Sequence, residues 1–110
     1  MDSETIIAIL ESLKITLDVT ETKDIAILTE ILNDAISEIK DARKYPSDMD
    51  ASEIEEDMLR YIPNIKKLTK YDFAMVGAEG QKSHSENGVA RAYEDRRKCF
   101  DGVVPYCVTF

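Results

Sequence analysis

Apolar residues recur every three or four positions along most of the N-terminal part of the chain, which is the spacing of one face of an α-helix. The first such segment covers residues 3–14, where Ile6, Ile9 and Leu13 share a face. Ser3 is the expected N-cap, because its hydroxyl can accept a hydrogen bond from a free amide of the first turn. The pattern therefore predicts a first helix over this segment.

A longer pattern begins at Thr20 or Thr22 and runs to about Lys44, and it is the clearest helix of the sequence. Its charged residues face away from an apolar stripe, a division that indicates an amphipathic helix packed on a core. The stripe consists of Ile25, Leu28, Leu32, Ala35 or Ile36, and Ile39. Pro46 is expected to end the helix, because the residue before a proline disfavours helical backbone.

Two further helical segments follow, and Pro63 separates them. Ser52 and Glu55 have the spacing of a capping box, which predicts that a third helix begins beside them. Proline is tolerated in the first turn of a helix but not in its interior, so a fourth helix is expected to begin near Pro63. Gly77 is the expected C′ residue after its last turn.

A polar segment, GAEGQKSHSENGVARAYE, follows the fourth helix and holds three of the four glycines and the only histidine of the chain. We expect a long polar loop over about 77–93. The next residues, YEDRRKCFDG, can form a short helix that stops at Gly102. The apolar tail VVPYCVTF contains Pro105, which favours an edge strand or an extended arm over a central strand.

The expected fold class is all-α, a small bundle of three to four helices with a long polar loop and an extended apolar C-terminal arm. The 110 residues are enough for one domain with a modest core. Within it, the pattern divides the chain into a helical core over 1–76, a polar loop over 77–94, and a short helix with the arm over 95–110.

The formal net charge of −8 limits the kinds of partner that the protein can bind. An acidic chain repels the phosphates of nucleic acid and the anionic surface of a membrane, so a protein partner is expected. No apolar run approaches the roughly 18 residues of a membrane-spanning helix. The N-terminus MDSETIIAIL carries acids where a signal peptide needs lysine or arginine, which predicts a protein made and used in a cytoplasm.

The sequence offers little for catalysis, metal or cofactor binding. His84 is the only histidine, and its neighbours Ser83 and Ser85 are adjacent in sequence, where a hydrolytic triad rarely assembles. Cys99 and Cys107 are expected to be reduced thiols, and a zinc site would need more ligands. We therefore expect no enzyme activity, metal or cofactor.

The polar loop does contain residues suited to protein recognition. Asn87 and Gly88 are typical of a tight turn, and the guanidinium of Arg91 can bind a carboxylate through two parallel hydrogen bonds. Tyr93 offers the large amphipathic surface that is enriched at interfaces. Candidate carboxylates are Glu79, Glu86 and Glu94. The loop is either satisfied by its own contacts or shaped for a partner, and the basic run from Arg96 to Lys98 is expected to pair with acids of a neighbouring surface.

The segment from Gly77 to Glu94 resembles the small head–tail connector, or adaptor, proteins of tailed bacteriophages and prophages. The likeness rests on GAEG, SHSENG and RAYE within this segment, and on the closing Val104–Pro105–Tyr106. The acidic, helix-rich first part and the length of the chain also fit that family.

The resemblance implies a structural protein at the head–tail interface of the virion, made in the host bacterial cytoplasm. It implies a ring of about a dozen copies beneath the portal protein, closed by contacts between neighbouring copies. The ring would extend the DNA exit channel without binding DNA specifically, and would dock a downstream tail-side protein, either a stopper or a tail completion protein.

The resemblance also implies which residues make contacts. The polar loop would lie at subunit or portal contacts, and the arm from Val103 to Phe110 would reach the portal, where it could add a strand to a sheet edge. The expected contact residues are Glu79, Glu86, Asn87, Gly88, Arg91, Tyr93, Glu94, Val103, Val104, Tyr106, Val108 and Phe110.

Two other functions remain open at this stage. The charge of −8 also suits an acidic DNA mimic that occupies a DNA-binding protein, although 14 basic residues are interspersed with the acids. A small hydrolase built on Ser83, His84 and Ser85 is the other, and activity that survived His84→Ala would eliminate it.

Overall fold

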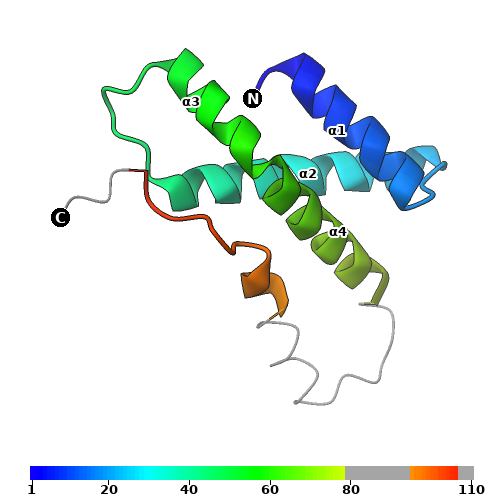
Figure 1. Cartoon of the computed structure of the whole chain (residues 1–110). Coiled ribbons are helices and arrows are strands. Elements are labelled where there is room, and N and C mark those ends of the chain that lie inside the picture. Colours follow the sequence, from blue (N-terminus) through cyan, green and yellow to red (C-terminus); the bar gives the residue numbers. More distant parts are fainter. Residues whose placement is uncertain (79–94, 107–110) are drawn as a thin grey trace.

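The computed structural model describes residues 1–78 and 95–106 (Figure 1). Within these ranges the chain forms four α-helices and no strand, which confirms the all-α prediction. The elements are α1 Ser3–Thr16, α2 Thr22–Arg43, α3 Ala51–Met58, the short 3₁₀ helix η1 Leu59–Tyr61, and α4 Ile62–Ala78.

The long helix α2 is the centre of the bundle. The helix α4 packs across it, and α1 packs against both α2 and α4 (Figure 1). The helix α3 continues through η1 into α4, so these elements follow one another along a single diagonal of the molecule. Side chains from all four helices can therefore meet on the same side of α2.

The core forms where these helices meet, and the predicted apolar stripe of α2 lies in it. Leu28, Leu32, Ala35 and Ile39 are all buried, while Ile25 and Ile36 are half-buried beside them. The other buried apolar residues are Ile9 and Leu13 of α1, Val19, Met58 of α3, Ile65 and Leu68 of α4, and Cys99. The spacing of apolar residues therefore identified the buried face of the central helix.

The N-cap of the first helix lies one residue before the expected one. Asp2 is the N-cap of α1, and its Oδ1 accepts a hydrogen bond of 2.8 Å from the amide of Thr5. Ser3 is the first residue of the helix, so the prediction that it caps α1 is wrong. A carboxylate accepts the amide as a hydroxyl would, and its charge also favours the positive end of the helix dipole.

The start of α3 also differs from the prediction. The helix begins at Ala51 and its N-cap is Asp50, so no capping box forms at Ser52. The Ser52 hydroxyl instead donates to Oδ2 of Asp50 at 3.2 Å. Glu55, the other predicted member of the box, pairs with the N-terminal amine of Met1 at 3.0 Å.

The helix boundaries predicted from Pro46 and Pro63 agree with the structure, whereas the one predicted from Gly77 does not. The helix α2 ends at Arg43, where Lys44 adopts left-handed backbone with φ of 47°, two residues before Pro46. Pro63 lies in the first turn of α4, as predicted. Gly77 does not end that helix, because α4 continues to Ala78.

The predicted polar loop lies outside the described residues, except for Gly77 and Ala78, which belong to α4. Further along the chain, residues 95–98 are helical and a turn leads to Gly102. Gly102 has φ of +83°, a backbone conformation that glycine adopts without strain. Val103 then packs against the core. The helical residues end at Lys98, four residues before Gly102, so Gly102 closes the turn after the short helix and not the helix itself.

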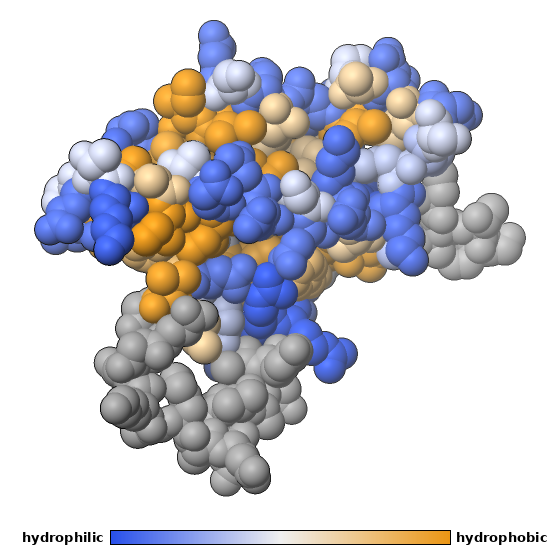
Figure 2. All heavy atoms as spheres, turned by 180° about the vertical axis from the view of Figure 1, so that it is seen from behind, coloured by the Kyte–Doolittle hydropathy of each residue, from blue (hydrophilic) through white to orange (hydrophobic). Residues whose placement is uncertain are grey.

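Hydrophilic residues cover much of the surface, but apolar side chains also reach it, as the orange patches of Figure 2 show. The large exposed apolar side chains are Ile7, Ile15, Leu59, Val76, Val104 and Tyr106. No helix in the described part of the chain is both long and apolar enough to cross a membrane.

Candidate functional site

A buried ion pair joins the end of α2 to α3. Arg43 donates from Nε to Oδ2 of Asp57 at 2.9 Å and from Nη2 to Oδ1 at 3.1 Å. The side chains are only 6% and 7% exposed. Two parallel bonds between charged groups fix both side chains in one geometry.

Tyr45 and Arg60 also contact this carboxylate, the latter from an exposed side chain at 3.6 Å. The Tyr45 hydroxyl donates to Oδ2 of Asp57 at 2.6 Å. Burial disfavours the phenolate and, with the hydrogen bond to Asp57, raises the pKa of Tyr45 to about 12. Burial alone would raise the pKa of Asp57, but the bonds from Tyr45 and Arg43 outweigh it and hold that pKa below its ordinary value. Asp57 is therefore ionised at neutral pH.

The same arginine holds the start of the C-terminal arm. Its Nη1 donates to the carbonyl of Val104 at 2.7 Å, and its own carbonyl accepts the amide of Tyr106 at 2.6 Å. The guanidinium carbon lies 5.3 Å from the ring centre of Tyr106 and 4.8 Å from that of Tyr61. We call Arg43, Tyr45, Asp57, Val104 and Tyr106 the arm anchor.

A second polar cluster holds the segment that follows the loop. Arg96 donates from Nε and Nη2 to the two carboxylate oxygens of Asp72, at 2.9 and 3.0 Å. Its Nη2 also reaches Oε2 of Glu38 at 2.6 Å, and these bonds raise the pKa of the guanidinium. Asn64 donates from Nδ2 to the carbonyls of Cys99 and Asp101, each at 2.9 Å.

We call Glu38, Asn64, Asp72 and Arg96 the loop anchor, because they fix residues 95–102 against α2 and α4. Cys99 lies inside this segment as a buried free thiol, and burial raises its pKa. A protonated, buried thiol is a poor nucleophile.

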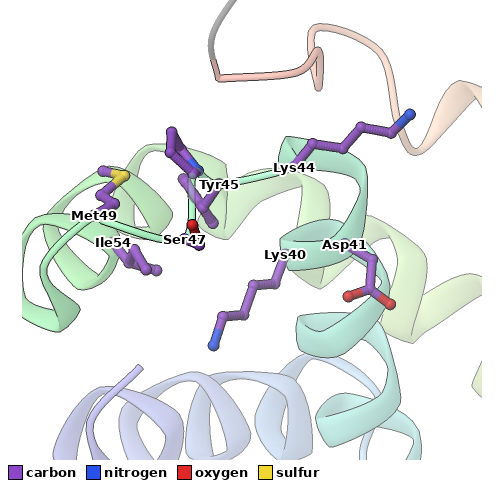
Figure 3. A pocket seen from close by; sticks show the side chains of 8 residues that line it. Lys40, Asp41, Lys44, Tyr45, Ser47, Met49 and Ile54 are labelled. Atoms are coloured by element: carbon purple, nitrogen blue, oxygen red, sulfur yellow. The ribbon is translucent and has the colours of Figure 1, made fainter.

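A shallow hollow lies beside the arm anchor, between the end of α2 and the start of α3 (Figure 3). Met49 and Ile54 form its apolar side, Lys40 extends toward it from α2, and Lys44 points away. Tyr45 lines the hollow and also contacts the ring of Tyr106 in a tilted arrangement, with 5.7 Å between ring centres and 52° between ring planes. This residue therefore connects the hollow to the arm.

Neither cluster has the composition of a catalytic or metal centre. Both pair arginine with carboxylates whose oxygens are already engaged in hydrogen bonds. In residues 1–78 and 95–106 no group of three or more histidine, cysteine, aspartate or glutamate side chains could hold a metal ion. The arrangement positions two chain segments at the surface rather than a reacting group.

Three of the predicted contact residues fall in the described part of the chain. Val103 packs against the core, whereas Val104 and Tyr106 remain 51% and 41% exposed while the arm anchor holds their backbone. The others lie outside the described residues: Glu79, Glu86, Asn87, Gly88, Arg91, Tyr93, Glu94, Val108 and Phe110. Arg96, expected to pair with a neighbouring surface, pairs with acids of its own chain.

Sequence reasoning missed Arg43 and Asp57, although one signal was present. Arg43 continues the apolar stripe of α2, four residues after Ile39, so a charge falls on the buried face of the helix. A buried charge needs a partner of opposite sign. That partner, 14 residues later, could not be chosen from the many acids of the sequence.

The loop anchor leads to a first prediction. Arg96→Ala should lower the free energy of unfolding by about 1–2 kcal/mol, because it removes a two-bond pair that is only partly exposed to solvent. Arg97→Ala is the matched control, since that side chain is exposed and should change stability by less than about 0.5 kcal/mol. Urea denaturation followed by circular dichroism measures both, and equal losses would contradict the role assigned to Arg96.

In the described part of the chain, a small helical bundle holds residues 95–102 and the start of the apolar C-terminal segment at its surface, an arrangement typical of binding or structural proteins. Residues 7–101 match the family described as phage gp6-like head-tail connector protein. The match covers most of the chain, so the chain belongs to this family of phage structural proteins. Comparisons with curated proteins and with solved structures gave no match.

Proposed function

We propose that the protein assembles as a ring of about a dozen copies beneath the portal and extends the DNA exit channel toward the tail. The match of residues 7–101 to the head–tail connector family carries this proposal. A net charge of −8 supports it, because an acidic wall does not retain a passing nucleic acid. The ring would bind the portal on one side and a tail-side protein on the other.

The contacts would come from the polar loop and the C-terminal arm. The arm anchor supports this for the first arm residues, since it fixes their backbone while Val104 and Tyr106 keep a large part of their surface exposed. Exposed apolar and aromatic side chains on a fixed backbone bind with little loss of conformational entropy. For the loop, including Arg91 and Tyr93, the support is the sequence resemblance alone.

Co-sedimentation with portal-bearing, DNA-filled capsids of the same phage tests the function. Three forms are compared: the full chain, a chain ending at Tyr106 and a chain ending at Gly102. The full chain should bind saturably. If the last four residues make the portal contact, both shorter forms should lose binding, whereas only the form ending at Gly102 should lose it if Val104 and Tyr106 suffice.

Circular dichroism measures whether each form is folded. All three forms are expected to fold, because each contains both Arg43 and Asp57, which form the buried ion pair. Binding by all three forms would keep the connector function and move the contact to the loop or the helices. No binding by the folded full chain would contradict the proposal and return the acidic DNA mimic as the alternative.

A further inference from the structure

Charge is divided unevenly along the diagonal formed by α3, η1 and α4. Residues 46–59 contain six acids and no base, whereas residues 60–71 contain four bases and no acid. Because α3 leads directly into α4, this division places opposite charges at different positions along one line of the molecule (Figure 1).

The basic half contains a hollow lined by lysines. Lys67 and Lys70 of α4 and Lys98 of the segment after the loop surround it, with Tyr71 and Asp101 in its lining. In the part of the chain that the structure describes, Lys67 and Lys70 form no ion pair, and Lys98 comes only within 3.7 Å of Asp95. We call these three residues the lysine hollow.

The acidic half contains a group of exposed carboxylates just before and within α3, which we call the acidic tip. It consists of Asp48, Asp50, Glu53 and Glu56. None of the four forms an ion pair with another described residue. The start of α3 and the segment after the loop lie at opposite ends of the molecule, so the tip does not reach the lysine hollow of its own copy (Figure 1).

We propose that the lysine hollow of one copy receives the acidic tip of the next copy. This inference rests on the proposed ring and names the surfaces that would join its subunits. A closed ring needs two different, complementary patches on each subunit. Two copies that each carry a charge of −8 repel one another on average, so a local match of opposite charge must offset this repulsion.

Duplex DNA is the other polyanion that such lysines could bind, but the distribution of charge favours a second copy. Asp101 lines the hollow, and Asp95 lies beside Lys98, so the lysines are interspersed with carboxylates that would repel phosphates. The acidic tip, in contrast, supplies carboxylates in every copy of the chain.

A charge-swap experiment tests the pairing. In the hollow variant, Lys67→Glu and Lys98→Glu reverse two exposed lysines; in the tip variant, Glu53→Lys and Glu56→Lys reverse two exposed acids. Binding to portal-bearing capsids is measured as copies bound per capsid at low salt, for each variant alone and for their mixture. The control, Lys14→Glu with Lys23→Glu, makes the same charge change as the hollow variant at positions of α1 and α2 that belong to neither surface.

Each variant alone should bind about tenfold fewer copies than the wild type, because like charges meet at every junction. The equimolar mixture should recover most of the binding. The acidic hollow of the hollow variant can accept the basic tip of the tip variant, and the unchanged lysine hollow of the tip variant can accept the unchanged acidic tip of the hollow variant. The control should bind as the wild type does.

Failure of the mixture to recover would overturn the pairing of these two surfaces. Normal binding by the hollow variant would overturn it as well, while the proposed function would stand; if that variant lost duplex-DNA binding instead, the lysines would be assigned to phosphates. Absence of binding by the folded wild type would refute the proposed function, and the inference with it.

Discussion

Asp57→Ala is expected to lower the free energy of unfolding by about 3 kcal/mol, because it leaves the charge of Arg43 buried without its carboxylate. The substitution also removes the acceptor of the Tyr45 hydroxyl. Urea denaturation at pH 7, followed by circular dichroism, measures the loss. At this pH the contribution of Asp57 is complete, because its pKa is lowered on folding and its stabilisation disappears only as the pH falls through that lowered value.

Two companion variants identify the cause. Glu56→Ala removes an exposed carboxylate next to Asp57 and should cost less than about 0.5 kcal/mol. The double variant Arg43→Met with Asp57→Leu removes both charges and should recover most of the lost stability, because no charge is left buried. If Asp57→Ala were as stable as Glu56→Ala, the buried pair would contribute nothing to folding.

Leu32→Ala should lower the free energy of unfolding by about 3 kcal/mol, because it removes buried methyl groups from the centre of the bundle and leaves a cavity. Leu32 is fully buried on α2, the helix against which both α1 and α4 pack. Thermal unfolding should show a midpoint lower by roughly 4–8 °C for each kcal/mol lost in a domain of this size.

Ile15→Ala is the matched control for this variant. Its side chain is 82% exposed on α1, so the loss of its methyl groups creates no cavity, and the change should stay within about 0.5 kcal/mol. A large loss in Ile15→Ala would mean that its exposed side chain is buried in an assembly. A small loss in Leu32→Ala would contradict the packing of α2.

The helices could be predicted because their buried residues repeat with helical spacing, as Leu28, Leu32, Ala35 and Ile39 do. Their first residues could not, because neighbouring side chains compete for the same cap. Aspartate and serine differ by roughly a few tenths of a kcal/mol as N-caps, so side-chain preference alone does not choose Asp2 over Ser3, or Asp50 over Ser52. The end of α4 could not be predicted from Gly77 either, because the helix continues through this glycine to Ala78.

The candidate site was only partly predictable. The polar loop and the apolar tail stood out by composition, and the motifs between Gly77 and Glu94 indicated the family that residues 7–101 match. The two anchors did not stand out, because they join residues far apart in the chain, such as Arg43 with Val104 and Asn64 with Asp101. Apart from the charge of Arg43 on the apolar stripe of α2, such contacts have no local sequence signal, because they follow from the packing of helices.

The order of synthesis gives the arm anchor a further meaning. Arg43, Tyr45 and Asp57 leave the ribosome well before Val104 and Tyr106, and they can bind one another as soon as α2 and α3 meet. The charge of the arginine is then already neutralised when the arm arrives to take its remaining donor. Release of the arm would therefore free one donor of Arg43 and leave the guanidinium paired with Asp57, so that no unpaired charge remains in the interior.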